Sequence, residues 1–411
     1  MASAPRKPFS RRIQNTPRSM IREILRVTER PDIISFAGGL PSPAFLDAAG
    51  VARAAGEVLA EDNCAALQYA TSEGFPPLRE WIARRYRTRF GLAVDPGEIL
   101  ITNGSQQALD ILGRILIDEG DPVAIEAPGY LGAIQAFSQY MPVFHPVPLG
   151  TEGPDPGEFS RIARTEDPVM YYAIPNSQNP SGISYSTRRR EEIASIISDS
   201  ETVLVEDDAY GEIQFSGDKR PSFSRLLPRD KVILLGTFSK IFSPGMRLGW
   251  LCAEGEILDH AVTAKQASDL HSNILAQRIL YRYLQCNDID AHISRIKKAY
   301  AARCSLMLHL MDELFPGEVT YTRPDGGMFV WLTLPHPLSA MELYRRALAE
   351  NVAILPGTPF YTNGAGDQGV RLNFSNADEE KITEGMTRLA RVLDAYTREC
   401  RKGQSSPHPE T

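Results

Sequence analysis

The sequence predicts an α/β fold built on a mostly parallel, seven-stranded sheet with helices on both faces. Seven short apolar runs lack a strict alternation with polar residues, which is typical of strands buried on both sides. Helical segments separate many of these runs, as the crossover connections between parallel strands require. Beyond about residue 255 the pattern changes to long helices and then to a smaller α+β segment.

The first 30 residues are polar, basic and interrupted by prolines, so we expect an arm there rather than a core element. Alanine-rich periodicity predicts a helix over residues 44–61, and a proline near its start supports another over 77–90. The predicted strands cover residues 99–102, 123–126, 143–147, 169–174, 203–206, 232–235 and 248–253. The helices predicted between them cover residues 106–117, 131–139 and 187–198.

The C-terminal third predicts two long helices, two further strands and a closing helix. The long helices reach Leu284 and Phe315, the strands lie near 327–334 and 370–374, and the closing helix covers about 378–397. Residues 403–411 are rich in serine and proline, which predicts a disordered tail.

The composition excludes several functional classes. A net charge of −7, without a block of Lys and Arg with interleaved aromatics, argues against a nucleic-acid partner. The sequence has neither the apolar run of a signal peptide nor one long enough to span a bilayer, so we expect no membrane partner. Five scattered cysteines without metal-ligand spacing indicate structural thiols in a reduced compartment. We therefore expect a cytoplasmic enzyme without a metal.

Lys240 is the most informative residue of the chain. It follows the predicted strand 232–235 in the turn Gly236-Thr-Phe-Ser-Lys240, and Arg247 comes seven residues later. A lysine held in this way can form a Schiff base with an aldehyde cofactor, while the hydroxyls and the arginine bind an anion beside it. An isolated lysine would instead be a solvated surface residue.

Other polar motifs follow other predicted strands, at the edge where ligands bind in such sheets. Gly104 permits a tight turn, after which Ser105 and Gln106 open a helix whose free N–H groups suit an anion; the alternative is an ordinary capped helix. Tyr130 suits stacking on a flat heterocycle or simple packing. Asn179 lies in a loop that is a turn by default, but its amide can donate to a phenolic oxygen.

Two further motifs complete the candidate site. Within Glu206-Asp-Asp208, one carboxylate can keep a pyridine nitrogen protonated, and Tyr210 can share a ring oxygen with Asn179; alternatively the acidic residues cap a loop. Arg371 lies on a predicted strand between apolar neighbours, where its guanidinium suits a substrate α-carboxylate or a surface ion pair.

Taken together, the chain resembles the pyridoxal-phosphate enzymes of the aspartate aminotransferase type, fold type I, of classes I and II. Within that superfamily it is most similar to the kynurenine/2-aminoadipate aminotransferase group. The matching motifs occur in order from about residue 18 to residue 375. They are Ile34-Ser-Phe-Ala-Gly-Gly-Leu-Pro41, Leu67-Gln-Tyr-Ala70, Asn103-Gly-Ser-Gln-Gln107, Gln178-Asn-Pro-Ser-Gly182, Glu206-Asp-Asp-Ala-Tyr210, Thr237-Phe-Ser-Lys240 with Arg247, and Val370-Arg-Leu-Asn-Phe374.

The resemblance implies a role for each matching residue. Lys240 corresponds to the lysine that carries the cofactor and shuttles a proton, with Asp207 at the pyridine nitrogen and Tyr210 at the ring hydroxyl as further catalytic residues. Asn179 shares the ring hydroxyl, and Tyr130 stacks on the ring. The residues implied for the phosphate are Ser105, Gln106, Thr237, Ser239, Arg247 and, from the neighbouring subunit of a homodimer, Tyr69. The residues implied for the substrate are Arg371, Asn179, Gly39, Leu40 and the mobile-arm residue Arg18.

The implied activity is an aminotransferase that moves an amino group from an L-amino acid to a 2-oxo acid, with 2-oxoglutarate expected, by a ping-pong mechanism. Another pyridoxal-phosphate reaction, as in a β-lyase, a racemase or a decarboxylating transaminase, stays open because it shares the same cofactor chemistry. A ligand-sensing regulator domain is disfavoured by the acidic balance and by the short stretch before the core. The implied segments are an arm with a small-domain segment, a large cofactor domain, a small C-terminal domain and the tail, over residues 1–45, 46–300, 301–402 and 403–411.

Overall fold

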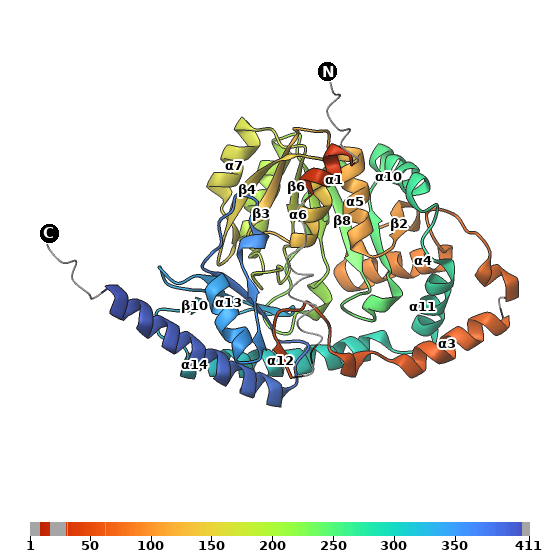
Figure 1. The fold of residues 1–411 in the computed structure, drawn as a ribbon. Coiled ribbons are helices and arrows are strands. Elements are labelled where there is room, and N and C mark those ends of the chain that lie inside the picture. Colours follow the sequence, from red (N-terminus) through yellow and green to blue (C-terminus); the bar gives the residue numbers. More distant parts are fainter. Residues whose placement is uncertain (1–8, 17–29, 31, 62, 405–411) are drawn as a thin grey trace, which may run out of the picture.

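The computed structural model describes residues 9–16, 30, 32–61 and 63–404 of the chain. Its centre is an eight-stranded sheet with helices packed around it (Figure 1). The order across the sheet is β2-β9-β8-β7-β6-β3-β4-β5. In chain order the strands are β2 (Ile99–Thr102), β3 (Pro122–Ala127), β4 (Val143–Gly150), β5 (Gly153–Pro154), β6 (Met170–Ala173), β7 (Val203–Asp207), β8 (Val232–Thr237) and β9 (Gly249–Cys252).

All seven predicted strands belong to this sheet, and the predicted α/β class is confirmed. The four neighbouring pairs formed by β3, β4, β6, β7 and β8 are parallel, whereas β9 is antiparallel to both β2 and β8. The prediction missed the eighth strand, β5, which turns back to pair with β4. Its two residues, Gly153 and Pro154, are too few to show a periodic pattern.

Alternate residues of the central strands face opposite layers of helices. Tyr171 and Leu204 belong to a hydrophobic core shared with α7, α8 and α9, whereas Tyr172 and Val205 belong to a larger core shared with α5, α6 and α10. The bounds of these helices are α5 (Ser105–Leu116), α6 (Leu131–Ser138), α7 (Pro156–Thr165), α8 (Thr187–Ser198), α9 (Phe223–Leu226) and α10 (Gly255–Ser268). Burial on both faces explains why these strands read as continuous apolar runs.

The register of the parallel strands brings their carboxyl ends to one edge of the sheet. Ala173 of β6 pairs with Glu206 of β7, and Asp207 of β7 pairs with Leu235 of β8. The polar residues that follow these strands are therefore neighbours, although the chain separates them widely.

The other sheets combine the two ends of the chain. β1 (Ile34–Ser35) pairs in parallel with β12 (Val352–Ala353), and the Asn373 N–H donates to the Phe36 carbonyl at 2.8 Å. An antiparallel sheet, in the order β10-β11-β14-β13, consists of β10 (Thr320–Tyr321), β11 (Phe329–Thr333), β14 (Gly369–Asn373) and β13 (Leu355–Pro356). The N-terminal segment thus contributes to the smaller α+β part, as predicted.

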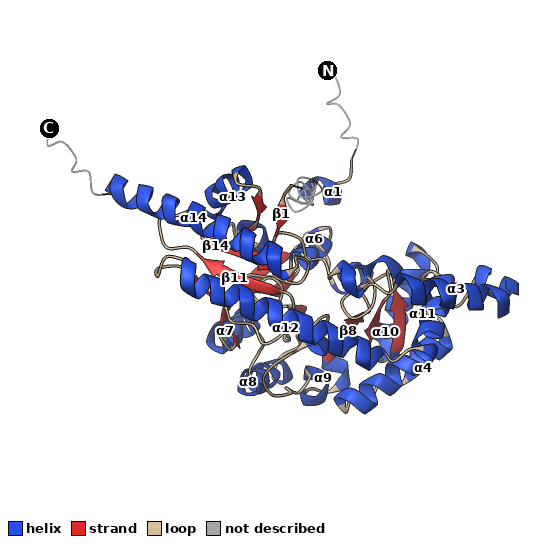
Figure 2. Cartoon of the chain, turned by 90° about the horizontal axis from the view of Figure 1, so that it is seen from below, coloured by secondary structure: helices blue, strands red, loops and turns tan. Residues whose placement is uncertain are grey.

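The remaining helices surround these sheets and connect them. They are α1 (Arg11–Asn15), α3 (Ala48–Glu61), α4 (Pro76–Arg85), α11 (Ile274–Cys286), α12 (Ile289–Leu314), α13 (Ala340–Ala349) and α14 (Glu379–Gln404). Figure 2 shows α12 extending from the smaller part toward the large sheet. The predicted domain boundary at residue 300 falls inside this continuous helix, and the division into domains stays a prediction.

Several predicted helices differ from the observed ones at their ends. The helix expected over 44–61 begins at Ala48, where the Asp47 carboxylate accepts the Gly50 N–H at 2.8 Å. The helix expected over 77–90 is regular only to Arg85, and a wider turn then ends at Gly91, whose φ is +65°. The closing helix extends to Gln404, seven residues beyond its expected end. Within the described residues, no helix is both long enough and apolar enough to cross a membrane.

Candidate active site

A cavity of about 360 Å³ opens at the carboxyl edge of the large sheet. Fifteen residues line it: Gly39, Ser105, Gln106, Tyr130, Ile174, Asn179, Asp207, Ala209, Tyr210, Thr237, Ser239, Lys240, Pro244, Arg247 and Arg371. Twelve of these were predicted from the sequence. The structure brings them together from the ends of five strands of the large sheet, from the middle of β14 and from the segment around Gly39. Their individual roles stay predictions.

Asp207 presents one free carboxylate oxygen to this cavity. Its side chain is buried, its Oδ2 accepts a hydrogen bond from Tyr172 Oη at 2.7 Å, and its Oδ1 has no partner among the described residues. Burial raises the pKa of Asp207 to about 6, while the Tyr172 hydrogen bond opposes this increase. A buried acceptor without a donor is costly, so Oδ1 fits a ligand that brings an N–H group.

A chain of hydrogen bonds joins Tyr210, Asn179 and Arg371. The Asn179 amide donates to Tyr210 Oη at 3.3 Å, and its Oδ1 accepts from Arg371 Nη1 at 2.8 Å. Arg371 Nη2 donates to the Ala37 carbonyl at 2.7 Å, whereas its Nε has no partner among the described residues. Burial lowers the pKa of Arg371 to about 10. A buried guanidinium that has no carboxylate partner in the described part of the chain fits an anionic ligand.

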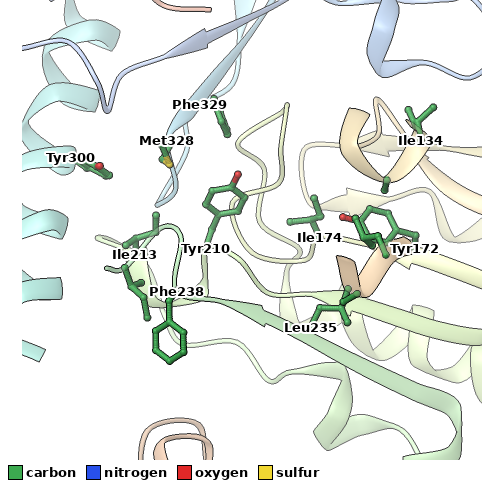
Figure 3. Close-up of a cluster of buried hydrophobic side chains, with 14 of the residues drawn as sticks. Ile134, Tyr172, Ile174, Tyr210, Ile213, Leu235, Phe238, Tyr300, Met328 and Phe329 are labelled. Atoms are coloured by element: carbon green, nitrogen blue, oxygen red, sulfur yellow. The ribbon is translucent and has the colours of Figure 1, made fainter. Parts of the chain in front are cut away.

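Two aromatic rings hold the Arg371 guanidinium in place. Its central carbon lies 4.4 Å from the Phe329 ring centroid and 5.3 Å from that of Phe360. Figure 3 shows Tyr210 pointing toward Phe329 from the buried cluster behind the site, and their ring centroids are 6.1 Å apart. The faces of the two rings stabilise the positive charge of Arg371 and restrict the plane of its guanidinium, which orients its N–H groups.

Lys240 lies in the turn after β8, as predicted, and its amine reaches across to the N-terminal segment. Nζ donates to the Gly39 carbonyl at 3.0 Å. Burial is the main cause that lowers the pKa of Lys240 to about 8, and the positive charges of Arg371 and Arg247 lower it further. A substantial fraction of this amine is therefore neutral near pH 8, as a nucleophile or general base requires.

The opposite end of the cavity is built for an anion. Ser105 begins α5, so the first N–H groups of that helix lack acceptors within the helix, and its dipole favours negative charge. The Thr237 and Ser239 hydroxyls lie 2.9 Å apart, and Arg247 Nη2 donates to the Asn103 carbonyl at 3.1 Å. The Gln106 side chain donates to the Gly132 carbonyl. Its backbone N–H suits a ligand because it lies in the first turn of α5, where N–H groups have no acceptor within the helix.

Gly104 permits Arg247 to approach the start of α5. Its φ is +72°, and a Cβ atom at this position would lie 2.6 Å from Arg247 Nη2. A side chain here would therefore push the guanidinium away from the start of α5.

Two further predicted residues, Tyr69 and Leu40, do not line the cavity. Tyr69 is 79% exposed, and its ring meets the His271 ring edge-on at 5.8 Å. Leu40 is also exposed, and its carbonyl accepts a hydrogen bond from Ser375 Oγ at 2.8 Å. Arg18 lies outside the described residues.

Sequence reasoning missed the residues that support the site from behind. Tyr172 lies within a predicted strand, but only the register between β6 and β7 shows that its hydroxyl reaches Asp207. Phe329 and Phe360 resemble ordinary core residues in the sequence. No motif links them to Arg371, because β11, β14 and the turn containing Phe360 meet only in the folded chain.

The geometry fits pyridoxal phosphate from end to end. Asp207 Oδ1 suits a protonated pyridine nitrogen, Asn179 and Tyr210 suit a ring hydroxyl, and Lys240 suits an aldehyde carbon. The start of α5, with the Thr237 and Ser239 hydroxyls and Arg247, suits a phosphate dianion.

Comparison with known proteins gives consistent matches. Residues 35–389 match the sequence profile of the family described as aminotransferase class I and II. The 2-aminoadipate transaminase of Thermus thermophilus is 44% identical over 378 residues, which cover 91% of this chain and 94% of that protein. The aromatic-amino-acid aminotransferase 1 of Thermococcus litoralis is 38% identical over 392 residues, with 94% of each covered.

A solved structure shows the same fold. The crystal structure of an alpha-aminoadipate aminotransferase from Thermus thermophilus, in complex with N-(5'-phosphopyridoxyl)-L-leucine, superposes with a TM-score of 0.88. It is 42% identical in sequence, and the match covers 95% of this chain and 98% of that one.

Proposed function

The chain belongs to the class I and II aminotransferases, and we propose that it moves the amino group of an L-amino acid to 2-oxoglutarate in two half-reactions. Its cofactor is pyridoxal phosphate, which withdraws electrons from the Cα atom of a bound amino acid and so makes the Cα proton removable. The observation that carries the proposal is the presence of Lys240, Asp207 and Arg371 around one cavity.

Lys240 acts as the general base in this proposal. Its Nζ removes the proton from the substrate Cα and returns a proton on the other side of the transferred nitrogen. A pKa of about 8 leaves the amine neutral often enough for this role, and the Gly39 carbonyl, 3.0 Å away, gives it a resting position.

Arg371 positions the substrate through its α-carboxylate. Asn179 and the Ala37 carbonyl hold the two Nη atoms, and the Nε–H is left for the ligand. A carboxylate fixed at this end of the cavity orients the Cα–H bond relative to Lys240, and such fixed orientation lowers the barrier to proton removal.

Asp207 keeps the cofactor's ring nitrogen protonated. Its pKa of about 6 means that it is mostly ionised at neutral pH, and Tyr172 stabilises the ionised form. Ser105, Thr237, Ser239 and Arg247 hold the phosphate.

The protein functions as a homodimer in this proposal, with Tyr69 completing the phosphate site of the neighbouring subunit. Tyr69 is exposed and lies outside the cavity of its own chain, as a residue that serves a partner must. Leu67 is 69% exposed beside it, and an exposed apolar residue next to Tyr69 suits a subunit contact. Sedimentation analysis should show a dimer, and Tyr69→Phe should weaken cofactor binding without dissociating that dimer.

Substrate choice follows from the cavity lining and from the relatives. Arg371 is the lining cation placed for an α-carboxylate. We propose that the side-chain end accepts 2-aminoadipate, aromatic and aliphatic amino acids, and that Arg18 and Leu40 help to bind these substrates. A panel of amino donors, assayed against 2-oxoglutarate and pyruvate, tests this breadth. Activity confined to a single donor would contradict it. A cytoplasmic location is likewise proposed.

Lys240→Ala is the direct test of the proposed chemistry. The variant should lose transamination and the absorbance of the covalently bound cofactor, while Lys231→Ala should keep both. The matched lysine, Lys231, lies away from the cavity and donates to the Ser200 carbonyl. Full activity in Lys240→Ala would refute the proposal.

A further inference from the structure

We infer that Glu126 is a positioning residue of this active site, which holds the loop of Asn179 and the turn of Tyr130 in one mutual arrangement. This inference rests on the proposed function, because both residues belong to the proposed cofactor site. Glu126 is the penultimate residue of β3, is 1% exposed and does not line the cavity.

Three donors from the Asn179 loop and its neighbours converge on this carboxylate. Its Oε1 accepts from the Ile174 N–H at 3.0 Å and from Tyr185 Oη, and its Oε2 accepts from Gln178 Nε2 at 2.9 Å. Ile174 lines the cavity, so one of these bonds anchors the cavity wall directly.

Gln178 extends the network to the Tyr130 side. Its Nε2 also donates to the Pro128 carbonyl at 2.8 Å, two residues before Tyr130. Its Oε1 accepts from both the N–H and the hydroxyl of Ser181, at 2.7 and 2.6 Å, which closes the turn around Asn179. The Glu126 carboxylate thus links the cavity wall at Ile174 to the turn that contains Tyr130, the residue proposed to stack on the cofactor ring.

The network reaches the substrate end through the residue next to Gln178. Asn179 bonds to Tyr210 and to Arg371 Nη1, so a shift of the loop moves the partners of the ring hydroxyl and of the substrate carboxylate together. A residue that only filled the core would not couple these two ends.

The surrounding donors require both side-chain oxygens of residue 126 to accept a hydrogen bond. Burial raises the pKa of Glu126 to about 8, and a protonated Oε1 can donate to Tyr185 Oη, which itself lies 3.1 Å from Tyr171 Oη. Both protonation states leave Oε2 free to accept from Gln178. A glutamine at 126 has only one acceptor oxygen. Its NH₂ group would therefore face either the Ile174 N–H or the Gln178 amide N–H, and both of these are donors.

The test compares Glu126→Gln with Glu206→Gln in the holoenzyme. Glu206 is a matched control: it is also fully buried near the end of a central strand, but it accepts from Ser222 Oγ and the Ser224 N–H, away from the Asn179 loop. Four quantities are measured: the melting temperature, the KM and the kcat for one amino donor, and the pH midpoint at which the absorbance of the bound cofactor changes.

Both variants should lower the melting temperature. Only Glu126→Gln should raise the KM, by about tenfold for one lost hydrogen bond, and shift the absorbance midpoint. Restoring a donor–acceptor pair with Glu126→Gln/Gln178→Glu should recover part of the KM and of the midpoint. Equal melting losses with an unchanged KM and midpoint in Glu126→Gln would overturn the inference.

A second variant covers the case in which Glu126→Gln does not fold. Gln178→Leu keeps the buried volume but removes the links to Glu126 and Pro128, and it should shift the same midpoint. An unchanged midpoint in a folded Gln178→Leu protein would also overturn the inference. The midpoint needs bound cofactor but no turnover, so a failure of the proposed amino transfer would be distinguishable from a failure of this inference.

Discussion

Replacing Arg371 with lysine gives a quantitative test of how the site binds an α-carboxylate. The guanidinium already donates to Asn179 Oδ1 and to the Ala37 carbonyl, and it keeps further N–H groups, including Nε–H, for a ligand. A lysine has three N–H groups on a single atom. If two of them replace the bonds to Asn179 and Ala37, one remains for the substrate. Arginine keeps three of its five N–H groups, of which two can bind the two oxygens of a carboxylate.

The loss of one hydrogen bond to a charged group corresponds to about 1.5–3 kcal/mol. Arg371→Lys should therefore lower kcat/KM for an amino acid by about 10- to 150-fold. The assay compares an amino acid with the primary amine that lacks its α-carboxylate. The wild-type preference for the amino acid should shrink by the same factor in the variant, because the amine never used the missing bond.

Arg303→Lys is the matched control for this prediction. Arg303 is a similarly buried arginine of the C-terminal part, but it donates to the Ser375 carbonyl and lies outside the cavity. It should leave the preference unchanged. Equal losses for the amino acid and the amine in Arg371→Lys would refute the reasoning, since they would indicate general damage to the site.

Three other changes test separate parts of the site. Tyr172→Phe removes the donor to Asp207 Oδ2 and should raise the pKa of Asp207 in the apoprotein by about 1 to 2 pH units. The carboxyl ¹³C chemical shift of Asp207 measures this pKa, and an unchanged titration would contradict the assignment. Gly104→Ala should displace Arg247 and weaken cofactor affinity at least tenfold, and its strained φ should lower the free energy of unfolding by about 1–2 kcal/mol. Gly120→Ala, which has open space around its Cβ, should lower the free energy of unfolding in the same way but leave cofactor affinity unchanged. In the apoprotein near pH 8, Lys240 should react with an amine-directed reagent faster than surface lysines, because its pKa of about 8 leaves more neutral amine; equal rates would count against that environment.

Much of the site was predictable because its residues follow strands that the sequence marks clearly. Asp207 ends a buried apolar strand, and Lys240 and Asn179 lie in the turns that follow two others; parallel strands bring such positions to one edge. Gly104 and Ser105 carry their own local signal, since a helix that begins after a glycine turn exposes free N–H groups.

The supporting residues were not predictable, because their roles depend on register and long-range packing. Tyr172 and Tyr171 are adjacent tyrosines of β6, yet the first donates to Asp207 and the second packs in the opposite core. Glu126 lies near the end of a strand, as Asp207 does, but the sequence does not show that its partners are Gln178, Ile174 and Tyr185. The N-terminal contribution through Ala37 and Gly39 also depends on the pairing of β1 with β12.

The most direct test of the proposed function is the stoichiometry of one half-reaction. Holoenzyme mixed with an amino donor alone should release one equivalent of 2-oxo acid per active site and then stop, because the amino group stays on the enzyme. Adding 2-oxoglutarate should restart the reaction and yield glutamate, and Lys240→Ala should release none. Continuous product formation from the amino donor alone would contradict amino transfer and indicate a lyase or racemase.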